Sequence, residues 1–127
     1  MAEFEVVATG PFCLVAMLTK VAKTFESLDA DKRAALLETM SIYANEGSRN
    51  IPKTQFTFEA RLSTGGHNAK QVAICAFKAW KVRLYGADVR VEQKPAFMCS
   101  EIDVAKKQNK GDQDMMARAA KKLAPYV

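Results

Sequence analysis

The spacing of apolar residues changes once along the chain, after the turn-forming segment SRNIPK at residues 48–53. Before this segment, apolar side chains recur every three or four residues, which is typical of amphipathic helices. After it, apolar and polar side chains alternate, which is typical of strands with one buried face. Helices followed by strands predict an α+β domain in which a helical layer covers an antiparallel sheet.

The first third of the chain predicts a strand and two helices. Residues 3–9 form a short strand pattern, which the Gly-Pro pair at residues 10–11 ends. Apolar residues in the segment 12–28 follow helical spacing, and so do those in residues 32–46. The short link between these segments predicts a hairpin of antiparallel helices that share one partner surface.

Strands are predicted over residues 55–62 and 71–85, with a loop of turn-forming residues between them. In the first segment, alternation places Phe56, Phe58, Ala60 and Leu62 on one side. In the second, the same rule predicts one face with Trp80, Val82 and Leu84 and an opposite face with Lys81, Arg83 and Tyr85.

The C-terminal part predicts two further strands and a helix. A turn is expected at residues 86–88, a short strand at 88–93 and a last, central strand at 95–100. Residues 112–123 begin with aspartates and end with lysines, which suits the dipole of a helix. No linker or repeat divides the sequence, so residues 1–127 are predicted to form a single domain.

Positive charge is concentrated in the second half of the chain. Residues 70–127 hold 12 lysines and arginines against 6 acidic residues, whereas residues 1–69 hold 7 against 8. A basic half with a sequence pI near 9.2 favours a polyanionic partner, of which nucleic acid is the commonest in a cytosol. A solvated basic surface without a partner is the alternative interpretation.

The sequence predicts no cofactor and no metal site. A phosphate-binding loop, a dinucleotide fingerprint and a His-Glu zinc motif are all missing from it. His67 is the only histidine, and Cys13, Cys75 and Cys99 are too far apart to form a ligand cluster with metal-binding spacing. No apolar stretch is long enough to span a membrane, and the acidic N-terminus does not resemble a signal peptide. We therefore expect a cytoplasmic protein without a membrane partner.

Cationic and aromatic residues are the strongest functional signal. Cleavage of RNA needs a base near the 2′-hydroxyl, positive charge around the phosphate and a proton donor for the leaving oxygen. Arginine and lysine stabilise the phosphate charge, and tyrosine can stack a base or transfer a proton. The alternative interpretation is that these alternating lysines and arginines only line the solvent-exposed face of a sheet. The candidate residues are Lys78, Lys81, Arg83, Tyr85, Arg90, Lys106, Lys107 and Lys110.

The order of elements and the C-terminal residues together resemble the RelE-type toxins of bacterial toxin–antitoxin systems, particularly the HigB-like branch of phages and prophages. The matching segments are WKVRLYG at residues 80–86, AFMCSEIDVAKKQNK at 96–110 and MMARAAKKL at 115–123. The resemblance implies an N-terminal strand and a helical hairpin packed on a curved antiparallel sheet, followed by a C-terminal helix. It also implies a ribosome-dependent endoribonuclease that cleaves mRNA without a metal, inhibits translation and is held inactive by a cognate antitoxin.

Carried over by position, the resemblance implies roles for single residues. Arg83 looks like the strand arginine that faces the scissile phosphate, although Arg90 is a second candidate for this position. Lys106 and Lys107 are similar to the basic pair that binds the RNA backbone.

Tyr85 is implied to stack a base, and Lys78, Lys81 and Lys110 are the remaining candidates for RNA binding. Family members often end in a histidine or tyrosine suited to proton transfer, but here only Tyr126 lies near the terminus, so the general base is unassigned. The alternative function is that of a phage or mobile-element protein that binds nucleic acid or a protein partner without catalysis.

Overall fold

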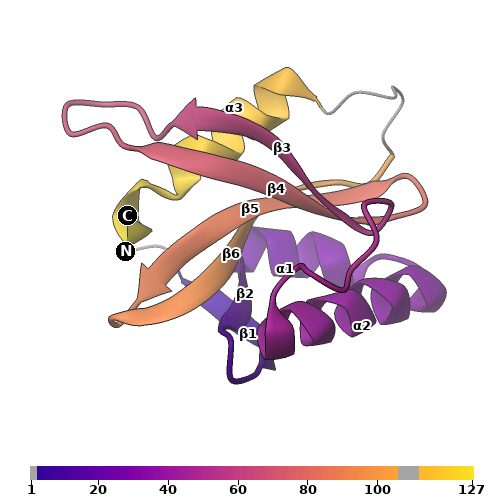
Figure 1. The fold of residues 1–127 in the computed structure, drawn as a ribbon. Coiled ribbons are helices and arrows are strands. Elements are labelled where there is room, and N and C mark those ends of the chain that lie inside the picture. The colour runs from indigo at the N-terminus through magenta and orange to yellow at the C-terminus, as the bar shows by residue number, and fades with distance from the viewer. Residues whose placement is uncertain (1–2, 106–111) are drawn as a thin grey trace.

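The computed structural model describes residues 3–105 and 112–127 of the 127-residue chain. Its strands are β1 (Phe4–Thr9), β2 (Leu14–Leu18), β3 (Phe56–Ser63), β4 (Gln71–Ala79), β5 (Val82–Val91) and β6 (Lys94–Asp103). They form one six-stranded sheet in the order β1-β2-β6-β5-β4-β3 (Figure 1). Neighbouring strands are antiparallel except for β2 and β6, which are parallel.

Helices cover both faces of this sheet. They are α1 (Thr19–Glu26), α2 (Ala30–Glu46) and α3 (Gln113–Lys122), followed by a short 3-10 helix, η1 (Ala124–Tyr126). In Figure 1, α2 lies below the sheet and contacts β1, β2 and β4, whereas α3 lies above it and contacts β3 to β6. The structure confirms the predicted α+β architecture with an N-terminal strand and a C-terminal helix. Within the described residues, no helix is long and apolar enough to cross a membrane.

Four aromatic rings form the core between α2 and the sheet. Tyr43 of α2 packs against Phe56, Phe77 and Phe97, and all six pairs of ring centroids lie 4.8–5.8 Å apart. Edge contacts of this kind add to the free energy gained by burying the rings. The Tyr43 hydroxyl donates to Asp88 Oδ1 at 2.7 Å, and burial raises the pKa of Tyr43, which keeps this donor protonated.

The prediction of one helix over residues 12–28 is wrong in its first part. Residues Leu14–Leu18 form β2, and α1 begins only at Thr19. Val15, Ala16 and Met17 are fully buried because β2 has a neighbouring strand on each side and is covered on both faces. A short strand buried in this way has a continuous apolar sequence, which helical spacing also fits.

The predicted strand over residues 71–85 is two strands joined by a tight turn at Trp80 and Lys81. The turn expected at residues 86–88 lies inside β5, and the chain turns instead at Glu92 and Gln93, whose φ angles are 52° and 68°. Gly86 is required for packing, because a Cβ atom there would lie 2.1 Å from the Met98 carbonyl oxygen. The glycine therefore marks a close approach of β5 to β6.

We expect Phe97→Ala to lower the free energy of unfolding by about 3–5 kcal/mol, because it leaves a cavity at the centre of the aromatic cluster. Phe12→Ala is the matched control, since Phe12 contacts the Tyr43 ring at 5.7 Å but is 49% exposed. For this control the expected loss is about 1 kcal/mol or less. Urea denaturation measures both values, and equal losses would contradict the central place of the cluster.

Candidate nucleic-acid interface

Arg83 lies near the start of β5, on the face of the sheet that α3 covers. It pairs in register with Lys78 of β4 and Asp103 of β6, and the side chains of such paired residues project from the same face. Tyr85 lies two residues further along β5, and its hydroxyl accepts a hydrogen bond of 3.4 Å from the backbone N–H of Asp112. Asp112 caps α3, so the Arg83 face is the α3 face.

Glu59 of β3 is the ion-pair partner of Arg83. The distance from Arg83 Nη1 to Glu59 Oε1 is 2.5 Å, and the two side chains are only 11% and 14% exposed. A charge-assisted hydrogen bond in such a sheltered place is stronger than the same contact in water. The pair therefore holds a guanidinium and a carboxylate in fixed positions at the surface of the sheet.

A β-bulge brings Glu59 to this face. The pairing of β3 with β4 shifts between Phe58 and Ala60, which leaves Glu59 without a directly opposite residue. A bulge of this type redirects side chains and reverses the alternation beyond it. The prediction that Phe56, Phe58, Ala60 and Leu62 share one side is therefore wrong: the first two face the α2 side and the last two the α3 side.

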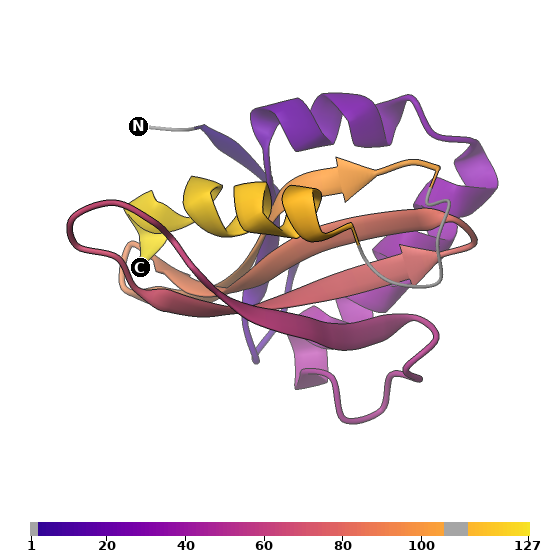
Figure 2. The ribbon, with the colours of Figure 1, turned by 90° about the horizontal axis from the view of Figure 1, so that it is seen from above.

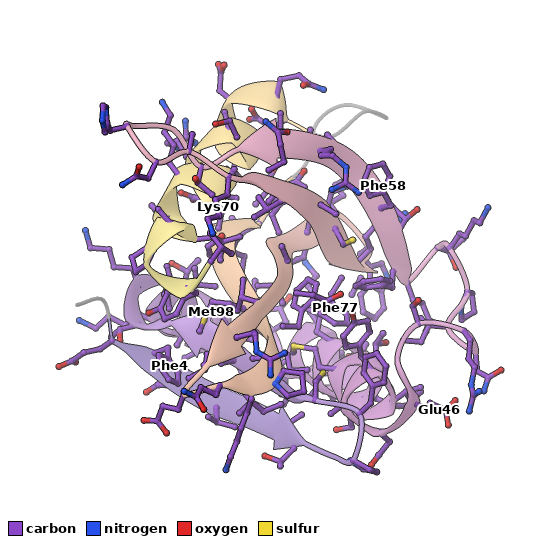
Figure 3. All side chains as sticks on the ribbon, turned by 60° about the vertical axis from the view of Figure 1, so that its left-hand side comes forward. Phe4, Glu46, Phe58, Lys70, Phe77 and Met98 are labelled. Atoms are coloured by element: carbon purple, nitrogen blue, oxygen red, sulfur yellow. The ribbon has the colours of Figure 1, made fainter. Side chains whose placement is uncertain are left out.

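An aromatic side chain lies just before this bulge, on the edge strand β3. Phe58 is 56% exposed, whereas Phe77 is fully buried, and Figure 3 shows Phe58 at the outer edge of the sheet and Phe77 in the interior. The exposed ring adds apolar surface to an outer strand of the sheet.

The β-sheet face around Arg83 is not strongly cationic. Lys78 and Arg83 are balanced there by Glu59 and Asp103, which belong to the neighbouring strands. The predicted common face of Lys81, Arg83 and Tyr85 is wrong, because Lys81 belongs to the turn before β5. The Arg83 guanidinium is therefore held in a fixed position, and nearby carboxylates balance its charge.

Tyr85 has no exposed ring surface on which a base could stack. The residue is fully buried, and burial raises the pKa of its hydroxyl. Its contact with the Asp112 backbone anchors the start of α3 to β5. The position of Tyr85 thus favours a structural role over the stacking role that the resemblance implies.

Trp80 is an exposed aromatic residue three positions before Arg83 in the chain. It occupies the first position of the β4–β5 turn with a φ of 53°, and it is 71% exposed. Positive φ is unfavourable for a bulky residue, and strained positions of this kind occur often at functional sites. Trp80 lines a cavity of about 300 Å³ together with Ala35, Glu38 and Thr39 of α2, so this cavity lies on the α2 side of the sheet. Lys81 follows directly and is also exposed.

Glu59, Lys78 and Arg83, with the turn residues Trp80 and Lys81, are called the Arg83 cluster below; the other predicted site residues lie apart from it or outside the described residues. Arg90 lies seven residues beyond Arg83, which corresponds to roughly 23 Å along a strand. Its Nη2 donates to the Gln93 carbonyl oxygen at 2.6 Å, in the turn at the opposite end of β5. Lys106, Lys107 and Lys110 lie outside the described residues.

Burial makes the thiols of Cys13 and Cys75 unreactive. Burial raises the pKa of Cys13 to about 11 and of Cys75 to about 12, so both thiols stay protonated and weakly nucleophilic at neutral pH. His67 is exposed in the β3–β4 loop. Across residues 3–105 and 112–127, no three His, Cys, Asp or Glu side chains are placed to hold a metal ion.

Sequence reasoning missed two residues of this cluster. Glu59 was not recognised, because strand alternation gives no sign of a bulge. Trp80 was expected inside a strand, because a Trp-Lys pair is not one of the sequence signals of a two-residue hairpin turn. No protein-family model, no curated protein and no solved structure matches the chain.

We expect the Arg83–Glu59 pair to show strong coupling in a double-mutant cycle. Glu59→Gln alone should lower the free energy of unfolding by roughly 1–3 kcal/mol, between the values for exposed and buried pairs, because Arg83 loses its partner. Arg83→Met combined with Glu59→Gln should cost less than the sum of the two single changes. Additive losses in urea denaturation would show that the contact contributes little.

Proposed function

We propose that this chain is the toxin of a toxin–antitoxin system, an endoribonuclease that cleaves mRNA on the ribosome and so inhibits translation. The observation that carries the proposal is the contact between the Arg83 guanidinium and the Glu59 carboxylate beside Lys78. A fixed cation and a fixed base are two of the groups that RNA cleavage needs. The resemblance to RelE-type toxins supports the same activity and supplies the expected partners, which are the ribosome, mRNA and a cognate antitoxin.

The proposed reaction assigns a separate task to each group. Glu59 removes the proton from a ribose 2′-hydroxyl, and the 2′-oxygen then attacks the adjacent phosphorus. The bond from phosphorus to the 5′-oxygen breaks, which leaves a 2′,3′-cyclic phosphate on one fragment. Arg83 keeps further N–H donors beyond the Nη1 contact with Glu59, and these stabilise the charge that develops on the phosphate. A lysine ammonium, for which Lys78 is the nearest candidate in register with Arg83, protonates the leaving oxygen.

The β4–β5 turn extends the proposed site toward single-stranded RNA. The exposed indole of Trp80 offers a flat surface for stacking a base, and Lys81 adds a cation for the adjoining phosphate. Stacking on an indole does not depend on base identity, so this contact supplies affinity and leaves base selection to other groups.

Induced expression in a bacterium tests the activity directly. We expect growth arrest with fragmented messages, and we expect Arg83→Ala and Glu59→Gln each to relieve it, since loss of either group slows catalysis by about 10²–10⁴-fold. Arg90→Ala is the matched control and should remain toxic, because Arg90 lies at the far end of β5. Normal growth at high expression, with intact messages, would contradict the nuclease function.

Binding of RNA without cleavage is the second candidate. It is favoured by the exposed Trp80 and Lys81 of the β4–β5 turn, which can bind RNA without any catalytic group, and the burial of Tyr85 removes one candidate for proton transfer. A binding protein would bind RNA with an affinity that falls steeply with salt and would leave messages intact. Cleavage in a purified translation system therefore separates the two functions.

We expect Trp80→Gly to separate stability from RNA binding. Glycine adopts a positive φ without strain, so the variant should keep the free energy of unfolding of the parent or exceed it by up to about 1 kcal/mol. Its affinity for single-stranded RNA should fall by roughly 5- to 100-fold, the value of one stacked base. Thermal unfolding and fluorescence anisotropy measure the two effects. Unchanged affinity in a folded variant would exclude Trp80 from the interface.

A further inference from the structure

A second cavity lies at the opposite end of α3 from Asp112, where the start of α1 approaches the end of α3. Its volume is about 580 Å³, which falls within the usual range of roughly 300–1,000 Å³ for small-molecule sites. The start of β1 and η1 also lie at this side of the molecule (Figures 1 and 2). Among its lining residues, Leu18, Val21 and Pro125 provide apolar surface. The cavity is separate from the Arg83 cluster.

Four lysines from two helices surround this cavity. Lys20 and Lys23 belong to α1 and Lys121 and Lys122 to α3, whereas Glu3 is the only acidic residue in the lining. The lysines of each helix alone would be an ordinary basic surface. Their meeting around one apolar cavity is unusual, because like charges that converge repel one another unless an anion lies between them.

Three of these four lysines have no ion-pair partner among the described residues. Lys122 Nζ lies 2.5 Å from Glu101 Oε2, so its charge is compensated. For Lys20, Lys23 and Lys121, no ion pair is formed with any residue in the described parts of the chain. Lys20, Lys23 and Lys121 therefore keep charges that could bind an anion at this cavity, and the stem of Lys121 also lies near Gly65 of the β3–β4 loop.

The first turn of α1 adds backbone donors on the same side. No side chain caps this helix, and the Thr19 N–H is taken by the Glu3 carbonyl oxygen. The N–H groups of Lys20 and Val21, which both line the cavity, have no acceptor within the helix. The positive end of the helix dipole supports an anion there, in addition to the lysines.

Apolar and buried groups close the inner part of the cavity. Ser100 is fully buried, and its hydroxyl is already used, because it donates to the Ala119 carbonyl oxygen at 2.9 Å. The Ser100 hydroxyl is therefore not available to donate a hydrogen bond to an anion. An apolar interior with a cationic rim matches a molecule that has an apolar body and one acidic head.

We propose that this cavity binds an amphiphilic anion whose carboxylate or phosphate head contacts Lys20, Lys23 and Lys121 and whose apolar body rests on Leu18, Val21 and Pro125. The site is independent of RNA cleavage, since none of its residues belongs to the Arg83 cluster. The head group has two chemical sources, a fatty acid or a phosphate monoester, and both present an anion on an alkyl body.

Titration calorimetry with octyl phosphate, octanoate, 1-octanol and inorganic phosphate tests this proposal on the full chain. We expect saturable one-to-one binding of at least one octyl anion, with 1-octanol and inorganic phosphate each at least tenfold weaker. The stronger of the two octyl anions identifies the head group. Binding of 1-octanol or inorganic phosphate as tight as that of the octyl anions would overturn the proposal, and so would no binding at all.

Charge-removing variants then locate the binding site. Lys20→Gln combined with Lys121→Gln should weaken the octyl anion at least tenfold, because both ammonium groups are exposed and their loss leaves the core intact. Lys53→Gln combined with Lys94→Gln is the matched control, since these exposed lysines lie outside the cavity lining. Equal affinity in both double variants would overturn the assignment. The experiment contains no RNA, so its failure leaves the nuclease proposal untouched.

Discussion

The parallel pairing of β2 with β6 is the contact on which the rest of the structure depends. Residues 14–17 of β2 lie in register with residues 96–99 of β6, and the middle of β2 is fully buried. Because α1 begins directly after β2, this pairing fixes the start of α1 beside β6. It joins the N-terminal third of the chain to the antiparallel strands that follow. Both the aromatic core and the lysine-lined cavity require that junction.

Two irregularities in the sheet then place polar groups on the α3 face. The bulge in β3 turns Glu59 toward Arg83, and the register shift between β5 and β6 leaves Ser100 without a directly opposite residue, next to Glu101, which pairs with Tyr85. Ser100 binds the backbone of α3, whereas Glu101 binds Lys122. A regular sheet would direct some of these side chains to the other face. The bulges thus determine both the position of the candidate catalytic pair and the attachment of the C-terminal helix.

The sequence predicts the elements whose pattern has only one physical explanation. The helical spacing of residues 32–46 and the polar ends of the C-terminal helix correspond to α2 and α3. The five apolar residues of β2 fit a helix and a buried strand equally well, so spacing alone could not separate them. The β4–β5 turn was missed because Trp80 adopts a positive φ that glycine or asparagine normally takes.

The candidate site was only partly predictable. Arg83 was a candidate from its strand position and the resemblance, and the structure places it in register with Lys78; its carboxylate partner, however, depends on a bulge that leaves no sequence signal. Tyr85 is buried because α3 covers it, and the alternation of residues along a strand does not reveal that a helix will cover this face. The roles that the RelE-type resemblance implies for these residues remain proposals.

A nuclear magnetic resonance titration with a short single-stranded RNA tests most directly whether the β4–β5 end of the sheet is the nucleic-acid interface. The account predicts that the side-chain N–H signals of Arg83 and Trp80 shift together and saturably as RNA is added. The Arg90 signal, from the opposite end of β5, should stay in place. Saturable shifts confined to Arg90 and its turn, or no shifts at Arg83 and Trp80, would contradict the assignment of this interface.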